Sequence, residues 1–169
     1  MTKPFNLTQW IEENRDLLKP PVGNKQIFVQ NDDFIVMVVG GPNGRKDYHW
    51  EEGEELFYQL KGDISVKIIN QEGKPETIHI KEGEMFLLPA RVPHSPQRPA
   101  DTVGLVIERY RKDGEIDKLM WFCENCDTKI HEAGFPLQDI GTQIKAAIEA
   151  FKSNEAARTC KNCGTIMHL

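Results

Sequence analysis

Short apolar stretches separated by turn residues follow one another along most of the chain, and they predict a series of β-strands. These stretches lie at Gln26–Gln30, Phe34–Val39, Leu56–Leu60, Ile64–Ile69, Thr77–Ile80, Met85–Leu88 and Val103–Tyr110. Turn sequences such as Asn-Asp-Asp at 31–33 and Lys-Gly-Asp at 61–63 separate neighbouring stretches. Short strands with frequent turns and no intervening helix indicate a sandwich or barrel. We therefore expect an all-β fold of the jelly-roll type, which can hold a metal inside a barrel.

Two helical patterns flank this strand-rich region. Apolar residues recur at helical spacing in Asn6–Leu18, where Asn6 or Thr8 can cap the first turn, and Pro20 ends the pattern. A second apolar stripe runs through Leu137–Phe151, and it is typical of a helix that packs on the barrel rather than of a cofactor-binding helix. We expect residues 1–115 to form the barrel with its N-terminal helix, and residues 116–169 to form a C-terminal appendage within one compact unit.

Composition and charge exclude several classes of protein. The chain has 169 residues and a net charge of -5 at pH 7, which suits a single soluble domain. No cluster of Lys and Arg offsets the negative charge, so a nucleic-acid partner is not expected. The stretch after Met1 lacks the apolar core of a secretory signal, and no apolar run approaches membrane-spanning length. We expect a cytoplasmic protein without a membrane partner.

The four cysteines form two C-x-x-C pairs, Cys123 with Cys126 and Cys160 with Cys163. In a reducing cytosol this pattern favours metal binding over disulfides. Four thiolates complete a tetrahedral shell for Zn(II) or for a rubredoxin-like iron, without the nearby His168. The alternative is two redox pairs or cysteines that bind nothing. A metal here would pin the ends of the appendage together.

A second group of possible metal ligands is His49, Glu55 and His94. The first two lie in G-R-K-D-Y-H-W-E-E-G-E-E-L-F-Y-Q-L-K-G at 44–62, and the third lies in G-E-M-F-L-L-P-A-R-V-P-H-S-P-Q-R at 83–98. An even spacing between His49 and Glu55 suggests that two paired strand ends present both side chains to one interior. Prolines on either side of His94 would hold that ligand in one orientation. Two imidazoles and one carboxylate with open positions suit a non-haem Fe(II) that binds substrate and oxygen together.

These two stretches resemble the two cupin motifs. The matching positions are His49, Glu55 and Gly62 in the first motif and Gly83, Pro89 and His94 in the second. The spacing to Gly62 selects Glu55 over Glu54 as the ligand. Glu51 occupies the place of the usual second His, and we expect Glu51, Glu52 and Glu54 to be solvated. In the second motif, Arg91 replaces the usual Gly and Arg98 replaces the usual Asn.

The departures from the general cupin pattern resemble one family, the 3-hydroxyanthranilate 3,4-dioxygenases of the bacterial and fungal type. The resemblance is carried by R-K-D-Y-H at 45–49, G-E-E-L-F-Y-Q-L-K-G at 53–62, P-H-S-P-Q-R at 93–98, I-E-R at 107–109 and the C-terminal cysteines. It implies an Fe(II) held by His49, Glu55 and His94. It also implies ring opening of 3-hydroxyanthranilate by O₂ to 2-amino-3-carboxymuconate semialdehyde, the quinolinate precursor of the kynurenine pathway.

The same resemblance assigns residues around the substrate. It implies that Arg45 and Arg98 bind the substrate carboxylate, and that Glu108 lies beside the hydroxyl and amine, with Glu55 close by. The residue types agree, because a planar guanidinium can hold a carboxylate with two hydrogen bonds. A carboxylate such as Glu108 inside an apolar strand is either at an edge or inside for a reason.

Two alternatives stay open. One is a cupin dioxygenase acting on another substituted 2-aminophenol or on salicylate, and the other is a non-catalytic cupin that binds a small acid through its metal. Small cupins usually pair through strand edges, so we expect a homodimer. The loops Val22–Lys25 and Gly40–Gly44 could close over the ring.

Overall fold

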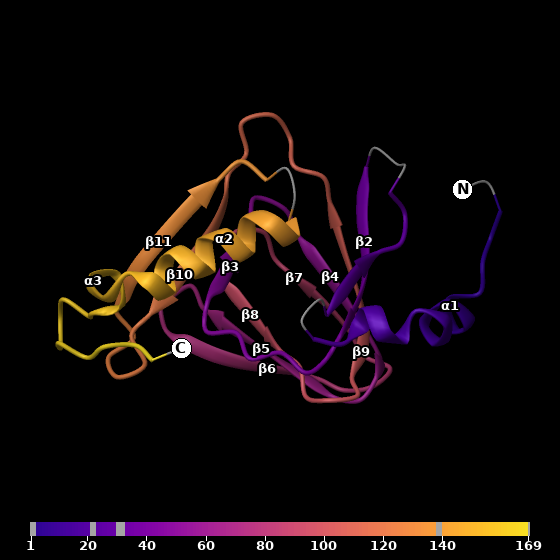
Figure 1. Cartoon of the computed structure of the whole chain (residues 1–169), viewed down its shortest axis with the longest axis horizontal. Coiled ribbons are helices and arrows are strands. Elements are labelled where there is room, and N and C mark those ends of the chain that lie inside the picture. The colour runs from indigo at the N-terminus through magenta and orange to yellow at the C-terminus, as the bar shows by residue number, and fades with distance from the viewer. Residues whose placement is uncertain (1–2, 21–22, 30–32, 138–139, 169) are drawn as a thin grey trace.

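The computed structural model describes residues 3–20, 23–29, 33–137 and 140–168, and its strands form two antiparallel β-sheets (Figure 1). The five-stranded sheet has the order β1 (Asn24–Gln26), β2 (Phe34–Gly40), β9 (Val103–Arg109), β4 (Glu55–Lys61) and β7 (Met85–Leu88). The six-stranded sheet has the order β11 (Lys129–Phe135), β10 (Asp117–Phe122), β3 (Tyr48–Trp50), β8 (His94–Gln97), β5 (Ile64–Ile69) and β6 (Pro75–Ile80). The predicted all-β class is confirmed.

The core lies between the two sheets, because buried and less buried side chains alternate along the strands. Phe57 on β4 and Val106 on β9 belong to the same apolar cluster as Val66 on β5 and Ile80 on β6. The buried, inward-facing positions are Glu55, Phe57 and Gln59 on β4 and Gly104, Val106 and Glu108 on β9. Three of these residues, Glu55, Gln59 and Glu108, are polar. Polar groups are therefore built into the interior of the barrel next to its apolar core.

Strand positions agree with the sequence pattern where a short apolar stretch is bounded by turn residues. The stretches predicted at Ile64–Ile69 and Met85–Leu88 are β5 and β7, and those predicted for β2, β4, β6 and β9 differ by one or two residues at an end. In place of the strand predicted at Gln26–Gln30, the structure has β1 at Asn24–Gln26. Gln30 lies outside the described residues. Two positions of the loop predicted at Val22–Lys25 thus belong to a strand, and Val22 lies outside the described residues.

Four further strands, β3, β8, β10 and β11, have no counterpart in the prediction. β3 has three residues and β8 has four with a proline among them, so neither carries a recognisable pattern. β10 pairs with β3 inside the six-stranded sheet, through Lys118 with Trp50 and Leu119 with His49. Residues 117–122, which the sequence assigned to the appendage, are therefore hydrogen-bonded into the barrel.

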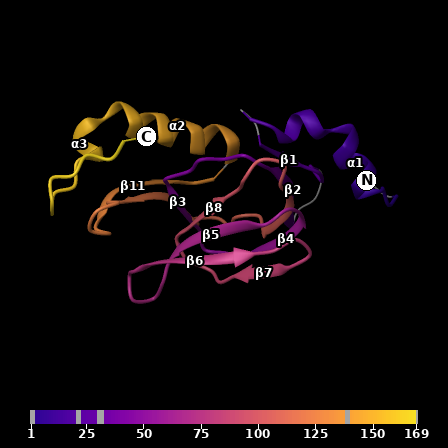
Figure 2. The same cartoon turned by 90° about the horizontal axis from the view of Figure 1, so that it is seen from below.

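Helices cover one side of the sheets, and Figure 2 shows α1 and α2 together on that side. α1 (Leu7–Glu13) begins after Asn6, whose side chain accepts a hydrogen bond from the Gln9 amide, and a 3₁₀ turn at Arg15–Leu18 follows it. α2 (Ile140–Ser153) and α3 (Glu155–Arg158) lie near the C-terminus. Among the described residues, no helix has the length and apolar character needed to cross a membrane.

The apolar stripe of α2 packs on the barrel as the sequence predicted. Phe151 stacks on Trp121 of β10 with 4.2 Å between ring centroids. Ile144 and Ile148 pack against the same cluster, which also contains Leu119. α2 is thereby fixed to β10, the strand next to the one that carries His49.

Candidate functional site

The three candidate ligands come from both sheets. His49 lies in the middle of β3, and its Cα pairs with that of His94, the first residue of β8, so that the two rings are 5.4 Å apart between centroids. Glu55 is the first residue of β4 in the opposite sheet, where it pairs with Glu108. The suggestion that paired strand ends carry His49 and Glu55 is therefore wrong, since β3 pairs with β8 and β10 whereas β4 pairs with β7 and β9.

The side chains of His49, Glu55 and His94 are buried and converge. One ligand atom from each lies within 4.8 Å of the others. Glu55 Oε2 is 2.6 Å from His94 Nε2, yet it has no partner with hydrogen-bond geometry among the described residues. Two nitrogens and an unsatisfied carboxylate oxygen around one point fit a divalent transition metal.

Charge complementarity within this group overrides the effect of burial. Burial alone would raise the pKa of Glu55, but the neighbouring His94 and His49 lower it. Burial alone would lower the pKa of His94, but the Glu55 carboxylate raises it. The site therefore favours a carboxylate facing a positive charge, which a metal cation would also satisfy.

Each histidine is oriented by a second hydrogen bond. His94 Nδ1 donates to the carbonyl of Val92 at 3.0 Å, and His49 Nε2 lies 2.7 Å from Asp117 Oδ2. Such partners fix the ring orientation of a metal-binding histidine. Sequence reasoning missed Asp117, which is fully buried at the start of β10. Its signal was an acidic residue two positions before the apolar run at 119–122.

A cavity of about 740 Å³ opens over these ligands. Its lining brings together His49, Glu55, His94, Arg45, Arg98 and Glu108, the residues that the family resemblance implied for the metal and the substrate. Ile144 and Ile148 of α2 line it as well, so this helix forms part of the cavity wall in addition to packing on the barrel. A volume of this size suits a small aromatic ligand.

Arg98 is a buried cation, and it has no carboxylate partner in the part of the chain that the structure describes. Its side chain is 3% exposed, and its Nη1 donates to Gln59 Oε1 at 3.2 Å. Among the residues that the structure describes, no acidic side chain forms an ion pair with it. Burial lowers the pKa of Arg98 to about 10, so the guanidinium is still charged at neutral pH. A buried, unpaired cation strongly favours an anionic ligand.

Arg45 differs from Arg98 because its charge is already paired. Its Nε lies 3.2 Å from Asp47 Oδ2, and its Nη2 contacts the same oxygen. Burial alone would lower the pKa of Arg45, but Asp47 outweighs this effect and raises it. Arg45 lines the cavity with its charge largely neutralised.

Glu108 and Glu51 form a buried acidic pair beside the cavity. They are 3% and 2% exposed, so the expectation that Glu51 is solvated is wrong. Both lie 2.7 Å from Nη1 of Arg111, which comes from the linker between β9 and β10. Burial, together with the nearby charge of Glu108, raises the pKa of Glu51 to about 10. Arg111, which is distant in sequence, lies beside Glu51 in the interior, and the local sequence pattern gave no sign of that contact.

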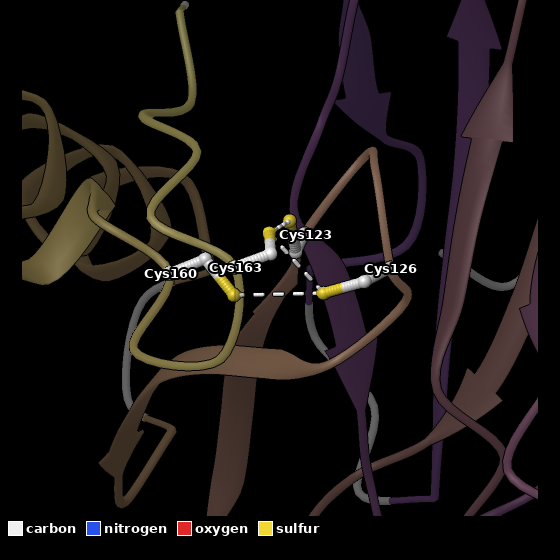
Figure 3. A group of neighbouring side chains, drawn as sticks. All are labelled: Cys123, Cys126, Cys160 and Cys163. Carbon is white, nitrogen blue, oxygen red and sulfur yellow. Dashed lines mark hydrogen bonds between the residues drawn. The ribbon is translucent and has the colours of Figure 1, made fainter.

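The four cysteines converge on one another (Figure 3). Cys123 Sγ lies 3.5 Å from Cys163 Sγ, and Cys126 Sγ lies 3.6 Å from Cys160 Sγ. A tetrahedral site with metal–sulfur bonds of about 2.3 Å needs sulfur atoms roughly 3.8 Å apart. None of these four cysteines forms a disulfide, so they fit a tetrathiolate metal site.

The two cysteine loops repeat one backbone pattern. The Cys123 amide donates to Thr128 and the Asp127 amide donates to Cys123, while the Cys160 amide donates to Thr165 and the Gly164 amide donates to Cys160. Asp127 and Gly164 occupy equivalent positions, and both have positive φ angles, of 57° and 76°. Two turns of the same form thus present their sulfurs to a common centre.

Comparison with known proteins gives a consistent result. Residues 1–152 match the family described as 3-hydroxyanthranilic acid dioxygenase. A protein from Bacillus thuringiensis named 3-hydroxyanthranilate 3,4-dioxygenase is 53% identical over 163 residues, which cover 96% of this chain and 90% of the relative. A protein of the same name from Neurospora crassa is 53% identical over 98% of this chain and 91% of the relative.

A third relative with this name, from Xanthomonas euvesicatoria, is 54% identical over 95% of this chain and 90% of the relative. Among solved structures, a cupin-2 domain containing protein from Shewanella frigidimarina is 18% identical with a TM-score of 0.48, over 59% of this chain and 91% of that one.

Proposed function

Because this chain belongs to the 3-hydroxyanthranilic acid dioxygenase family, it is an oxidoreductase that opens the ring of 3-hydroxyanthranilate with O₂, and we propose that His49, Glu55 and His94 hold its catalytic iron. Support comes from the burial of all three side chains and from their convergence within 4.8 Å. Fe(II) supplies the one-electron chemistry that allows O₂ to react with a closed-shell aromatic ring. The product is 2-amino-3-carboxymuconate semialdehyde, the precursor of quinolinate.

We propose that Arg98 orients the substrate by its carboxylate. The supporting observation is a buried guanidinium without an acidic partner among the described residues, in the same cavity as the three ligands. Two parallel hydrogen bonds from one guanidinium would fix the plane of the carboxylate and hence of the ring. Arg45 would assist to a lesser extent, because Asp47 already neutralises its charge. Holding the ring in one orientation beside the metal is the main contribution of these side chains.

Glu108 is proposed to accept or relay the proton of the substrate hydroxyl. It is 3% exposed, it lines the cavity, and it faces Glu55 across the β4–β9 pairing. A carboxylate within hydrogen-bond reach of the hydroxyl can take its proton and can orient the neighbouring amine. The apolar residues Ile144 and Ile148 of α2 would keep water away from this transfer.

Glu108→Gln tests this role, because Gln preserves shape and one acceptor but cannot take a proton. We expect the variant to keep its fold and catalytic iron and to bind substrate, while single-turnover oxygen consumption becomes at least tenfold slower. An iron assay and an anaerobic substrate titration accompany the kinetics. Loss of iron would mean that Glu108 supports the metal instead, and turnover at the normal rate would make it a structural carboxylate.

The observation that carries the assignment of the site is that one cavity contains a His–Glu–His group and a buried arginine, Arg98, which has no acidic partner among the described residues. The decisive experiment measures oxygen uptake when 3-hydroxyanthranilate is added to Fe(II)-loaded protein and to its His49→Ala variant. His49→Ala should abolish uptake and should leave one metal per chain, held by the cysteines. Normal uptake by His49→Ala would show that these residues do not hold the iron.

The tail cysteines, Cys123, Cys126, Cys160 and Cys163, are proposed to hold a structural Zn(II) or iron. Their sulfur–sulfur distances and their two matching loops support this. Thiol ligands suit a reducing compartment, so cytoplasm remains the proposed location. Elemental analysis of purified wild-type and His49→Ala protein would identify the tail metal, because only the cysteine site should remain in the variant.

A homodimer also remains a proposal. Met85 and Leu87 are 63% and 53% exposed on β7, an edge strand of the five-stranded sheet, and an exposed apolar edge favours pairing with another chain. Light scattering after size-exclusion chromatography should give twice the mass of the chain. Leu87→Lys should shift the protein toward monomer. A wild-type protein with the mass of a single chain would contradict pairing.

A further inference from the structure

Arg111 stands at the centre of a buried charge network that extends from the proposed metal site. Its Nε and Nη2 donate to the two carboxylate oxygens of Asp117, each at 2.7 Å. Its Nη1 donates to the Arg109 carbonyl at 3.0 Å and lies 2.7 Å from one oxygen each of Glu108 and Glu51. The Arg111 side chain is 5% exposed, and the three carboxylates are 1% to 3% exposed. Glu108 Oε2 and both oxygens of Glu51 have no partner with hydrogen-bond geometry among the described residues, so Arg111 holds Asp117 by hydrogen bonds and holds Glu108 and Glu51 by proximity of charge.

Two of these acids connect directly to the chemistry. Asp117 contacts the His49 ring at 2.7 Å, and Glu108 lines the substrate cavity. A guanidinium has a rigid planar arrangement of donors, so the position of Asp117 relative to Glu108 is set by the geometry of Arg111.

A purely structural role for Arg111 would be to hold together the two ends of the linker between β9 and β10. A second pair already does this at the surface, because Arg109 forms two hydrogen bonds of 2.7 Å with Glu115, also six residues further along. The Arg109 and Glu115 side chains are 30% and 18% exposed, and neither lines the cavity. The Arg109–Glu115 pair therefore provides a matched control for an ion pair that only closes the linker.

We propose that Arg111 is a positioning residue that fixes two parts of the active site at once, His49 through Asp117 and Glu108 by direct contact. Removing the fork of hydrogen bonds should let His49 turn away from the metal and should let Glu108 shift relative to the substrate hydroxyl. Arg111 can act in this way only if His49, Glu55 and His94 hold the iron as proposed above.

The test compares Arg111→Lys, Asp117→Asn and the control Glu115→Gln. Arg111→Lys keeps a positive charge beside Asp117, Glu108 and Glu51, but it loses the two parallel hydrogen bonds from the guanidinium to Asp117. The first measurement is the Fe(II) affinity of the catalytic site, obtained by anaerobic competition with a chelator after subtracting the metal that His49→Ala retains. The second is the anaerobic dissociation constant of 3-hydroxyanthranilate, and the third is kcat and KM at saturating iron.

Arg111→Lys should lower the Fe(II) affinity by about 10- to 100-fold, the usual effect of losing the partner of a metal-bound histidine. It should also lower kcat at saturating iron at least tenfold while changing KM by less than about threefold, since Arg98 governs substrate binding. Asp117→Asn should reproduce the loss of metal affinity with a smaller loss of kcat. Glu115→Gln should leave the metal affinity and both kinetic constants as in the wild type.

The double variant Arg111→Lys/Asp117→Asn shows whether the two residues act on His49 together. If Arg111 works through Asp117, the double variant loses less metal affinity than the product of the two single losses. Wild-type metal affinity and kcat in Arg111→Lys, with only a lower melting temperature, would reduce Arg111 to a structural ion pair.

Should Arg111→Lys fail to fold, Asp117→Asn alone decides the His49 half of the proposal, and an unchanged metal affinity there would overturn it. If His49→Ala itself retained the catalytic metal, the assignment of the iron site would fail instead.

Discussion

Among single side chains, Arg98 and Arg45 differ in whether an acidic side chain neutralises their charge. Both line the cavity, but only Arg45 has an acidic partner, Asp47, among the described residues. Losing a charge-assisted hydrogen bond in a closed pocket costs roughly 2–5 kcal/mol. Arg98→Ala should therefore lower kcat/KM for 3-hydroxyanthranilate at least tenfold, and Arg45→Ala should lower it less. Steady-state oxygen uptake measures both effects.

The control for the Arg98→Ala prediction is a second substrate that lacks the carboxylate. 2-Aminophenol has no carboxylate, so the deficit of Arg98→Ala should shrink when this compound replaces 3-hydroxyanthranilate. An equal loss on both compounds would mean that Arg98 supports the fold of the cavity rather than the carboxylate.

Within strand β9, Gly104 makes room for Arg98, the residue proposed to bind the substrate carboxylate. A Cβ at this position would lie 2.7 Å from Gln59 Oε1 and 3.1 Å from Arg98 Nη1. Backbone also approaches closely, with the Tyr58 carbonyl oxygen at 3.1 Å, so the side chains must give way. Gly104→Ala should displace Gln59 and Arg98, and it should raise KM for 3-hydroxyanthranilate by about threefold or more, since a well-packed interior transmits such shifts.

Gly134→Ala in β11 serves as the matched control for Gly104→Ala. It also adds a methyl group to a strand, but the nearest atom to the new Cβ would belong to the Ile116 side chain, at 3.3 Å. We expect Gly134→Ala to leave KM unchanged. A rise in KM of the same size in both variants would contradict a specific displacement of Arg98.

Across the fold, the cysteine site joins the end of β10 to the segment after α3, and α2 between them packs on Trp121 and lines the cavity. A structural metal contributes free energy of folding, so its loss should destabilise this part of the molecule. Cys123→Ser should lower the melting temperature and the tail-metal content, while kcat per catalytic iron falls much less. Calorimetry, elemental analysis and oxygen uptake measure the three quantities.

His168→Ala is the control for the tail, because four thiolates complete a tetrahedral shell without this exposed histidine. It should keep the tail metal and the melting temperature of the wild type. If Cys123→Ser lost activity per iron as strongly as stability, the two metal sites would not be separable.

Local sequence alone determined much of the fold and the identity of the proposed ligands. Short apolar stretches bounded by turn residues, at Ile64–Ile69 and Met85–Leu88, were enough to locate β5 and β7. The motif spacing pointed to His49, Glu55 and His94, which the structure brings together. Cysteine spacing likewise anticipated the tail cluster, since each pair lies within one tight turn.

Only the tertiary structure decided which charges are buried and what they contact. Glu51 was expected in solvent, yet Arg111, sixty residues further along, approaches it to 2.7 Å. Asp117 belongs to a segment assigned to the appendage, and only the pairing of β10 with β3 brings it to His49. A carboxylate in the interior depends on a partner that reaches it from another element, so its burial cannot be inferred from its own neighbours in sequence.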